Sequence, residues 1–167
     1  IIAGGIMVDI AQKNLPEGEF FDVICETAKC LPDAVQLLTP CTIGNGWLRI
    51  ANTSRYAMTF YNKYTGDGIR VYLDAEKLEK WPELRSWFLR EKPKHEQDLD
   101  LIIKQFHDAG ATIFSTQRVR VSPEFLEGTK KKHETIAICP SCNEAYNSSL
   151  GDVCPACRGE VPYRVIK

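Results

Sequence analysis

Two strand-like runs, AMTFYN at 57–62 and IRVYLD at 69–74, frame the turn Thr65-Gly66-Asp67-Gly68. Both runs are rich in β-branched and aromatic residues, and Asp-Gly between such runs is a strong hairpin signal. In the second run apolar residues alternate with Arg70, Tyr72 and Asp74. This pattern predicts a hairpin with one buried face and one face that meets water or a partner.

Helical and strand-like patterns extend outward from the hairpin in both directions. Pro16-Glu17-Gly18 ends the first pattern, and Gly110 ends the last helix. We expect helices over 1–15, 30–38, 75–90 and 96–109, and strands over 20–25, within 41–50 and at an exposed 118–121. The sequence therefore predicts an α+β core with a mixed β-sheet flanked by helices.

Composition narrows the class of protein. The 167 residues are 44% hydrophobic and 26% charged, with a net charge of −1. These values fit a globular chain and argue against nucleic acid as a partner, because nucleic-acid-binding proteins usually carry a basic excess. No run approaches the ~20 apolar residues of a membrane span, and we expect no secretory leader because the chain shows no basic-then-apolar segment. We expect a cytoplasmic protein without membrane contact, whose natural start lies upstream because the chain opens without Met.

Four cysteines near the C-terminal end give the strongest chemical signal. Cys139-Pro140-Ser141-Cys142 is followed, eleven residues later, by Cys154-Pro155-Ala156-Cys157. Two residues between thiols let one tight turn direct both sulfurs at a single ion, and two such turns complete a tetrahedron. The alternatives are two disulfides, a redox dithiol or a [4Fe–4S] cluster. The spacing favours one structural zinc per chain, or iron in its place.

A domain edge is expected where the chain becomes polar and basic, near 128–134. We predict an α+β core over 1–130 and a four-cysteine zinc-finger domain over 131–167. The second domain is too short for a self-sufficient hydrophobic core, so the metal must hold it. Its few basic residues and its limited aromatic content, Tyr146 and Tyr163, give little support for nucleic-acid binding.

Three further cysteines lie early in the chain. Cys30 precedes a predicted helix, where the helix dipole and free N–H groups favour the thiolate. Cys41 precedes a Gly44-Asn45-Gly46 loop that can bring backbone close to a ligand. Cys25 lies in an apolar strand, and we expect it to be buried there as a small hydrophobic residue. For Cys30 and Cys41 the residues alone leave function and packing both open.

The stretches 29–36 (KCLPDAVQ) and 39–45 (TPCTIGN) resemble the E subunit of molybdenum/tungsten formylmethanofuran dehydrogenase. The likeness continues through 55–60 and 68–74 and ends in the Cys-x-x-Cys pair. The resemblance implies a thioredoxin-like core and a treble-clef or zinc-ribbon finger, typically as a homodimer. It also implies a core site at Cys30, with neighbours Asp33, Gln36, Cys41 and Asn45, that can hold a second metal. An N-terminal His-Gly-His-x-Cys-Pro-Gly motif should complete that site just before Ile1.

These observations favour an accessory or metal-handling protein that acts with molybdenum or tungsten enzyme subunits. The chain offers no recognisable pterin, iron–sulfur or molybdenum ligand set that would perform the dehydrogenase reaction alone. Two alternatives remain open: a free-standing metal- or thiol-dependent enzyme that uses Cys30, and a zinc-finger adaptor that binds proteins.

Overall fold

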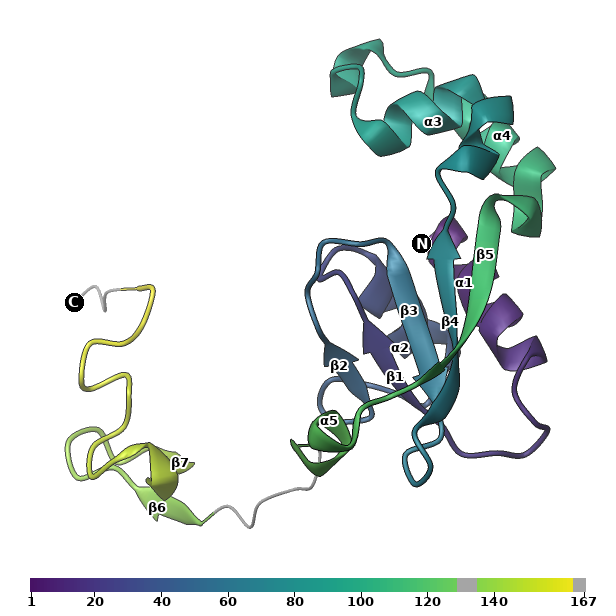
Figure 1. Cartoon of the computed structure of the whole chain (residues 1–167). Coiled ribbons are helices and arrows are strands. Elements are labelled where there is room, and N and C mark those ends of the chain that lie inside the picture. Colours follow the sequence, from purple (N-terminus) through teal and green to yellow (C-terminus); the bar gives the residue numbers. More distant parts are fainter. Residues whose placement is uncertain (129–134, 164–167) are drawn as a thin grey trace. The chain divides into compact units, whose positions relative to one another are not determined.

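The computed structural model describes residues 1–128 and 135–163 and divides the chain into two compact units, Ile1–Thr129 and Lys130–Lys167. We call them the core unit and the finger unit, and Figure 1 shows the elements of both.

A five-stranded mixed sheet forms the centre of the core unit (Figure 1). Its order is β2-β1-β3-β4-β5, with β1 and β2 parallel and the other neighbours antiparallel. The strands are β1 (Asp22–Cys25), β2 (Leu48–Ile50), β3 (Ala57–Tyr61), β4 (Asp67–Leu73) and β5 (Phe114–Arg120). The predicted mixed sheet and its central hairpin, β3–β4, are confirmed.

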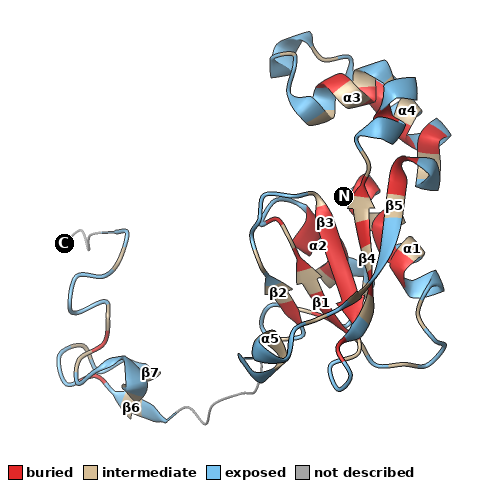
Figure 2. Ribbon diagram, in the orientation of Figure 1, coloured by how far each residue is buried: buried red, intermediate tan, exposed pale blue. Residues whose placement is uncertain are grey.

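Helices α1 (Ile2–Lys13) and α2 (Leu31–Leu38) pack on one face of this sheet. α2 also supplies the crossover between β1 and β2, which parallel neighbours require. In β1, β3 and β4 apolar core residues occupy alternate positions and face the helices, and Figure 2 shows buried residues concentrated in this part of the core unit. They include Met7, Val8, Val23, Cys25, Met58, Phe60, Ile69 and Val71. Cys25 is fully buried, as predicted.

The two helices approach closely at Gly4 of α1. A Cβ at Gly4 would lie 2.5 Å from Ala34 Cβ, whereas a Cβ at Gly5 would lie 3.6 Å from Leu38 Cδ1, an ordinary contact. We expect Gly4→Ala to destabilise the core by about 1–3 kcal/mol through overpacking. The matched control, Gly5→Ala, should stabilise it by about 0.5–1 kcal/mol because Ala costs less backbone entropy in a helix. Urea unfolding of the two variants measures both shifts, and a stabilised Gly4→Ala variant would contradict this packing.

The helical region beyond β4 corrects two predicted boundaries. The helix expected over 75–90 is two pieces, a 3₁₀ turn over Glu76–Lys80 and α3 (Pro82–Leu89). Pro82 lacks an N–H and cannot continue the first piece, but it suits the first position of a new helix. The helix expected over 96–109 begins later, as α4 (Leu99–Ala109), because Asp98 caps it by accepting the Leu101 N–H at 2.9 Å.

The strand predicted at 118–121 is also longer than expected. β5 pairs with the whole of β4, from Asp67–Arg120 to Leu73–Phe114. The alternating residue pattern identified only the exposed end of this strand. Its first residue, Phe114, directly follows a 3₁₀ turn, so no loop in the sequence marks where the strand begins. The short helix α5 (Pro123–Gly128) follows β5.

The second face of the sheet is less exposed than the alternation in β4 predicts. The Arg70 guanidinium pairs with both carboxylate oxygens of Glu26, which follows β1, at 2.5 and 3.0 Å. It also donates to Gln117 of β5 at 3.0 Å. The Arg70 and Glu26 side chains are 15% and 13% exposed, so the pair is largely removed from water.

The finger unit is a small two-stranded module. β6 (Ile136–Ile138) pairs antiparallel with β7 (Ala145–Asn147), and a 3₁₀ turn over Ser148–Leu150 follows. Across the described residues of the whole chain, no helix has both the length and the apolar character needed to cross a membrane.

Candidate functional site

The structure brings the sulfurs of all four predicted ligands together in the finger unit. Each Sγ of Cys139, Cys142, Cys154 and Cys157 lies within 4.8 Å of the others. The Cys139 and Cys157 sulfurs are 3.9 Å apart, and those of Cys142 and Cys154 are 3.7 Å apart. Zn–S bonds of ~2.3 Å in a tetrahedron place neighbouring sulfurs ~3.8 Å apart, so the cluster has the dimensions of a zinc site.

Tight turns hold each cysteine pair in this arrangement. In the first knuckle the Cys139 N–H donates to the Glu144 carbonyl, and the Asn143 N–H donates back to the Cys139 carbonyl, both at 2.9 Å. Asn143 adopts a left-handed conformation (φ 62°), which asparagine tolerates better than most residues. In the second knuckle Gly159 takes this conformation (φ 83°) and its N–H donates to Ala156. The local sequence therefore folds the ligands into place.

The pKa values of the clustered thiols indicate that the cluster suits a bound cation. Backbone N–H groups, first that of Cys154, lower the pKa of Cys139 to about 6, which favours a thiolate there. The neighbouring sulfurs, first that of Cys142, raise the pKa of Cys157 to about 12, because a second thiolate in the cluster would be repelled by the first. A divalent ion removes this conflict by binding all four thiolates. The residues present thus fit zinc, held by four sulfurs with no open position.

Cys30 has an unusual position in the core unit. It is exposed, it is the N-cap residue of α2, and its backbone is left-handed (φ 53°, ψ −28°). The Leu31 N–H donates to the Lys29 carbonyl at 2.5 Å across Cys30, which makes the turn tight. A non-glycine residue in this region of φ costs about 1–2 kcal/mol. Tyr56 lies nearby: burial, followed by the closeness of Cys30 and Cys25, raises its pKa to about 12.

Gln36, Cys41 and Asn45 hold the loop that follows α2. The Gln36 side chain accepts the Ile43 N–H at 3.2 Å. Asn45 accepts the N–H groups of Thr42 and Trp47 and donates to the Pro40 carbonyl. Cys41 is buried and donates its S–H to the Phe21 carbonyl at 3.3 Å, and burial raises its pKa to about 11. These three side chains therefore make the contacts of a structural scaffold.

The five predicted core residues lie along α2 and in the loop that follows it. Cys30 and the exposed Asp33 lie at the N-terminal end of α2, Gln36 lies one helical turn after Asp33, and Cys41 and Asn45 lie in the loop. Within 1–128 and 135–163, the structure gathers three or more His, Cys, Asp or Glu ligands at the finger cluster alone.

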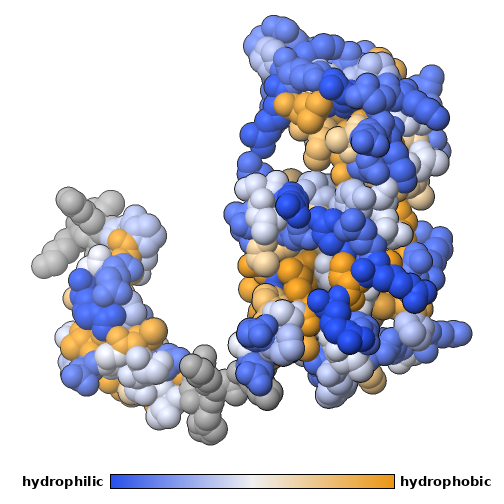
Figure 3. All heavy atoms as spheres, in the orientation of Figure 1, coloured by the Kyte–Doolittle hydropathy of each residue, from blue (hydrophilic) through white to orange (hydrophobic). Residues whose placement is uncertain are grey.

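Two features were not predicted as functional. The second sheet face carries a shallow cavity of about 330 Å³ beside the Glu26–Arg70 pair, lined by Ile24, Glu26, Ala51, Thr53, Thr59, Val119, Arg120, Val121, Ser122 and Phe125. Figure 3 shows apolar atoms gathered on this side of the core unit within a hydrophilic frame. The other feature is Arg158, which directly follows the last cysteine ligand and contacts backbone carbonyls in the finger. Its position next to a ligand was the signal that sequence reading could have used.

Two family models match the chain. "FmdE, Molybdenum formylmethanofuran dehydrogenase operon" covers residues 1–122, and "FmdE treble clef zinc finger" covers residues 130–164. The resemblance noted from the sequence is confirmed by both matches. The second match also agrees with the four-sulfur cluster found in the finger unit.

Known proteins that are similar to this chain include the following two. A crystal structure of an FmdE-like protein from Syntrophus aciditrophicus, named for the E subunit of tungsten formylmethanofuran dehydrogenase, is 49% identical, with a TM-score of 0.84 over 96% of this chain and 83% of that one. A probable S-adenosyl-L-methionine-binding protein of Archaeoglobus fulgidus is 28% identical over 115 residues. That match takes in 66% of this chain, which spans about a third (31%) of the archaeal protein's length.

Proposed function

Because this chain belongs to the FmdE family, we propose that it is an accessory, metal-handling protein that serves a molybdenum or tungsten enzyme. Its two thiol sites have different purposes. The finger holds one zinc permanently, and the core presents Cys30 to a second metal ion or to a partner subunit. The protein works as a homodimer in the cytoplasm.

The finger zinc is structural in this proposal. Cys139, Cys142, Cys154 and Cys157 hold it, and four thiolates leave no position for a water or a substrate. When bound, the ion supplies cross-linking of the two knuckles. This chemistry is what a unit too small for its own hydrophobic core needs in order to fold.

The observation that carries the Cys30 role is its strained, exposed position at the start of α2. Non-glycine residues with positive φ persist where the surrounding fold enforces them, and they concentrate at functional sites. Here the strained backbone holds an exposed thiol at the beginning of a helix, where a metal ion or a partner can reach the sulfur.

Metal titration of the Cys30→Ser variant tests the proposal. Zinc-loaded protein is titrated with further Zn²⁺, and native mass spectrometry counts the bound ions. We expect wild type to take a second, weaker-bound ion and Cys30→Ser to stay at one. Ser54→Ala is the matched control, since Ser54 is also exposed and left-handed (φ 62°) but offers no thiol. Equal second-ion binding by wild type and Cys30→Ser would overturn the Cys30 role.

A protein-binding adaptor is the second candidate, and one feature of the finger favours it. Ile136 and Ile138 lie on the same side of β6 and are 61% and 64% exposed, and Leu150 is 51% exposed. Apolar atoms are visible on the finger in Figure 3. If wild type binds no second ion, this surface becomes the better account of what the protein does.

A further inference from the structure

The loop between the two knuckles must return Cys154 to the first cysteine pair. Eleven residues separate Cys142 from Cys154, and they include β7, a 3₁₀ turn and Gly151. The end of this loop carries little apolar packing, since Leu150 and Asp152 are exposed and Val153 is half-buried. Polar contacts must therefore fix its course.

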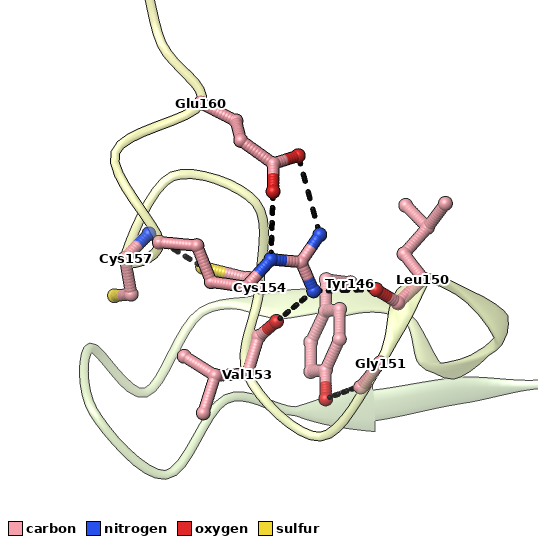
Figure 4. Close-up of polar contacts among 8 residues, drawn as sticks. Tyr146, Leu150, Gly151, Val153, Cys154, Cys157 and Glu160 are labelled. Atoms are coloured by element: carbon pink, nitrogen blue, oxygen red, sulfur yellow. Dashed lines mark hydrogen bonds and ion pairs between the residues drawn. The ribbon is translucent and has the colours of Figure 1, made fainter.

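Arg158 supplies those contacts (Figure 4). Its Nη1 donates to the Leu150 carbonyl at 2.5 Å and to the Val153 carbonyl at 3.0 Å. Its Nε and Nη2 donate to the two carboxylate oxygens of Glu160 at 2.8 and 3.2 Å. One guanidinium thus joins the end of the loop to the residues that follow the second knuckle. A lysine ammonium has the charge but lacks the planar fork that makes these contacts together.

The loop is shaped to admit the guanidinium. Gly151 has φ 120°, and a Cβ there would lie 2.6 Å from Arg158 Nη1. On the other side the Tyr146 hydroxyl donates to the Gly151 carbonyl at 2.8 Å. The missing side chain at Gly151 leaves room for Arg158, and Tyr146 holds the backbone against it.

These contacts enclose the second pair of ligands. Val153 immediately precedes Cys154, and Arg158 immediately follows Cys157. The hydrogen bond from Arg158 Nη1 to the Val153 carbonyl therefore closes a loop of the chain that contains both cysteines. Arg158 is also the one Lys or Arg among residues 135–163. Zn²⁺ with four thiolates carries a net charge of −2, which a nearby guanidinium partly offsets.

We propose that Arg158 is a positioning residue for the finger metal, and that it controls how fast the finger releases zinc. By fixing the second knuckle, Arg158 keeps Cys157, the exposed ligand, from leaving the ion. Cys139 and Cys154 are buried, so a competing chelator cannot reach these two ligands first. The inference rests on the proposed zinc occupancy of the finger.

Transfer of zinc from the full chain to an excess of a chromogenic chelator tests the inference. We expect release from Arg158→Met to be about 10- to 100-fold faster than from wild type, because charge-assisted hydrogen bonds are lost. Arg158→Lys should still release zinc several-fold faster than wild type, because a lysine keeps the charge but cannot make the hydrogen bonds of the planar guanidinium. Glu144→Gln, an exposed change on the first knuckle, is the matched control and should release zinc at the wild-type rate.

The visible spectrum of the Co²⁺-loaded variants and the zinc content of wild type separate the possible failures. The visible spectrum of the Co²⁺-loaded variants should stay tetrahedral, which shows that the ligand set is retained while the rate changes. If Arg158→Met holds no metal, Arg158→Lys decides by the same rate criterion. If both variants release zinc at the wild-type rate, the inference is overturned, whereas the proposed zinc site in the finger is not affected. Absence of zinc from wild type would instead overturn the proposed function.

Discussion

Cys154→Ser is expected to unfold the finger unit and leave the core unit folded. Serine offers no thiolate, so the variant loses the tetrahedral site that joins the two knuckles. Structural zinc contributes about 10–16 kcal/mol to the folding of small zinc-finger peptides at neutral pH. Few other forces are available, because the apolar residues of β6, Ile136 and Ile138, are 61% and 64% exposed and contribute little burial within the described residues of the unit. The finger should therefore have no stable apo form.

Amide NMR spectra measure this result directly. In Cys154→Ser the resonances of 135–163 should collapse to unfolded positions while those of 1–128 keep their dispersion. Ser141→Ala, which changes an exposed residue between two ligands, serves as the matched control and should preserve all of them. A strong chelator added to wild type should reproduce the Cys154→Ser spectrum. A finger that stays folded in either experiment would show that its fold does not depend on the metal.

Arg70→Met is expected to destabilise the core unit by about 3 kcal/mol, because it leaves a largely buried carboxylate without its partner. Glu26 would keep the Thr53 hydroxyl, which donates to it at 3.3 Å, but would lose both guanidinium bonds. The double variant Glu26→Leu/Arg70→Met removes both charges and should recover most of the loss. Chemical denaturation of the three proteins measures this. If the single and double variants are equally destabilised, the unpaired charge is not the cause.

The pair also predicts a pH dependence. The Arg70 hydrogen bonds lower the pKa of Glu26 below its ordinary value of 4.5. A lowered carboxyl pKa in the folded state adds stability that is complete above the unfolded pKa and is lost as the pH falls toward the folded one. Wild type should therefore lose stability below pH 4.5 in part through Glu26. Arg70→Met should lose less over the same range, because its unpaired carboxyl gains by protonation.

The finger could be predicted from the sequence because its information is local. Two residues between thiols fix a knuckle, and the four-cysteine spacing names the geometry without reference to any distant residue. The hairpin β3–β4 was predicted for the same reason, from Asp-Gly between two strand-like runs. Pro82 was an equally local signal for the break between Lys80 and α3, and it should have divided the predicted helix.

Contacts set by sheet register could not be predicted in this way. Glu26 and Arg70 are 44 residues apart and meet because β1 and β4 both pair with β3. The partners of Arg158 are backbone carbonyls, which leave no mark in the sequence. The hydrogen bonds by which Gln36, Cys41 and Asn45 hold the loop after α2 likewise appear only in the structure.

The zinc content of the purified full chain tests the central claim most directly. After dialysis against a weak chelator, plasma mass spectrometry should find one zinc per wild-type chain, one per Cys30→Ser chain and none per Cys154→Ser chain. That result would place the resident metal in the finger and leave Cys30 for an exchangeable ion or a partner. Zinc retained by Cys154→Ser, or lost from Cys30→Ser, would contradict the division of roles between the two units.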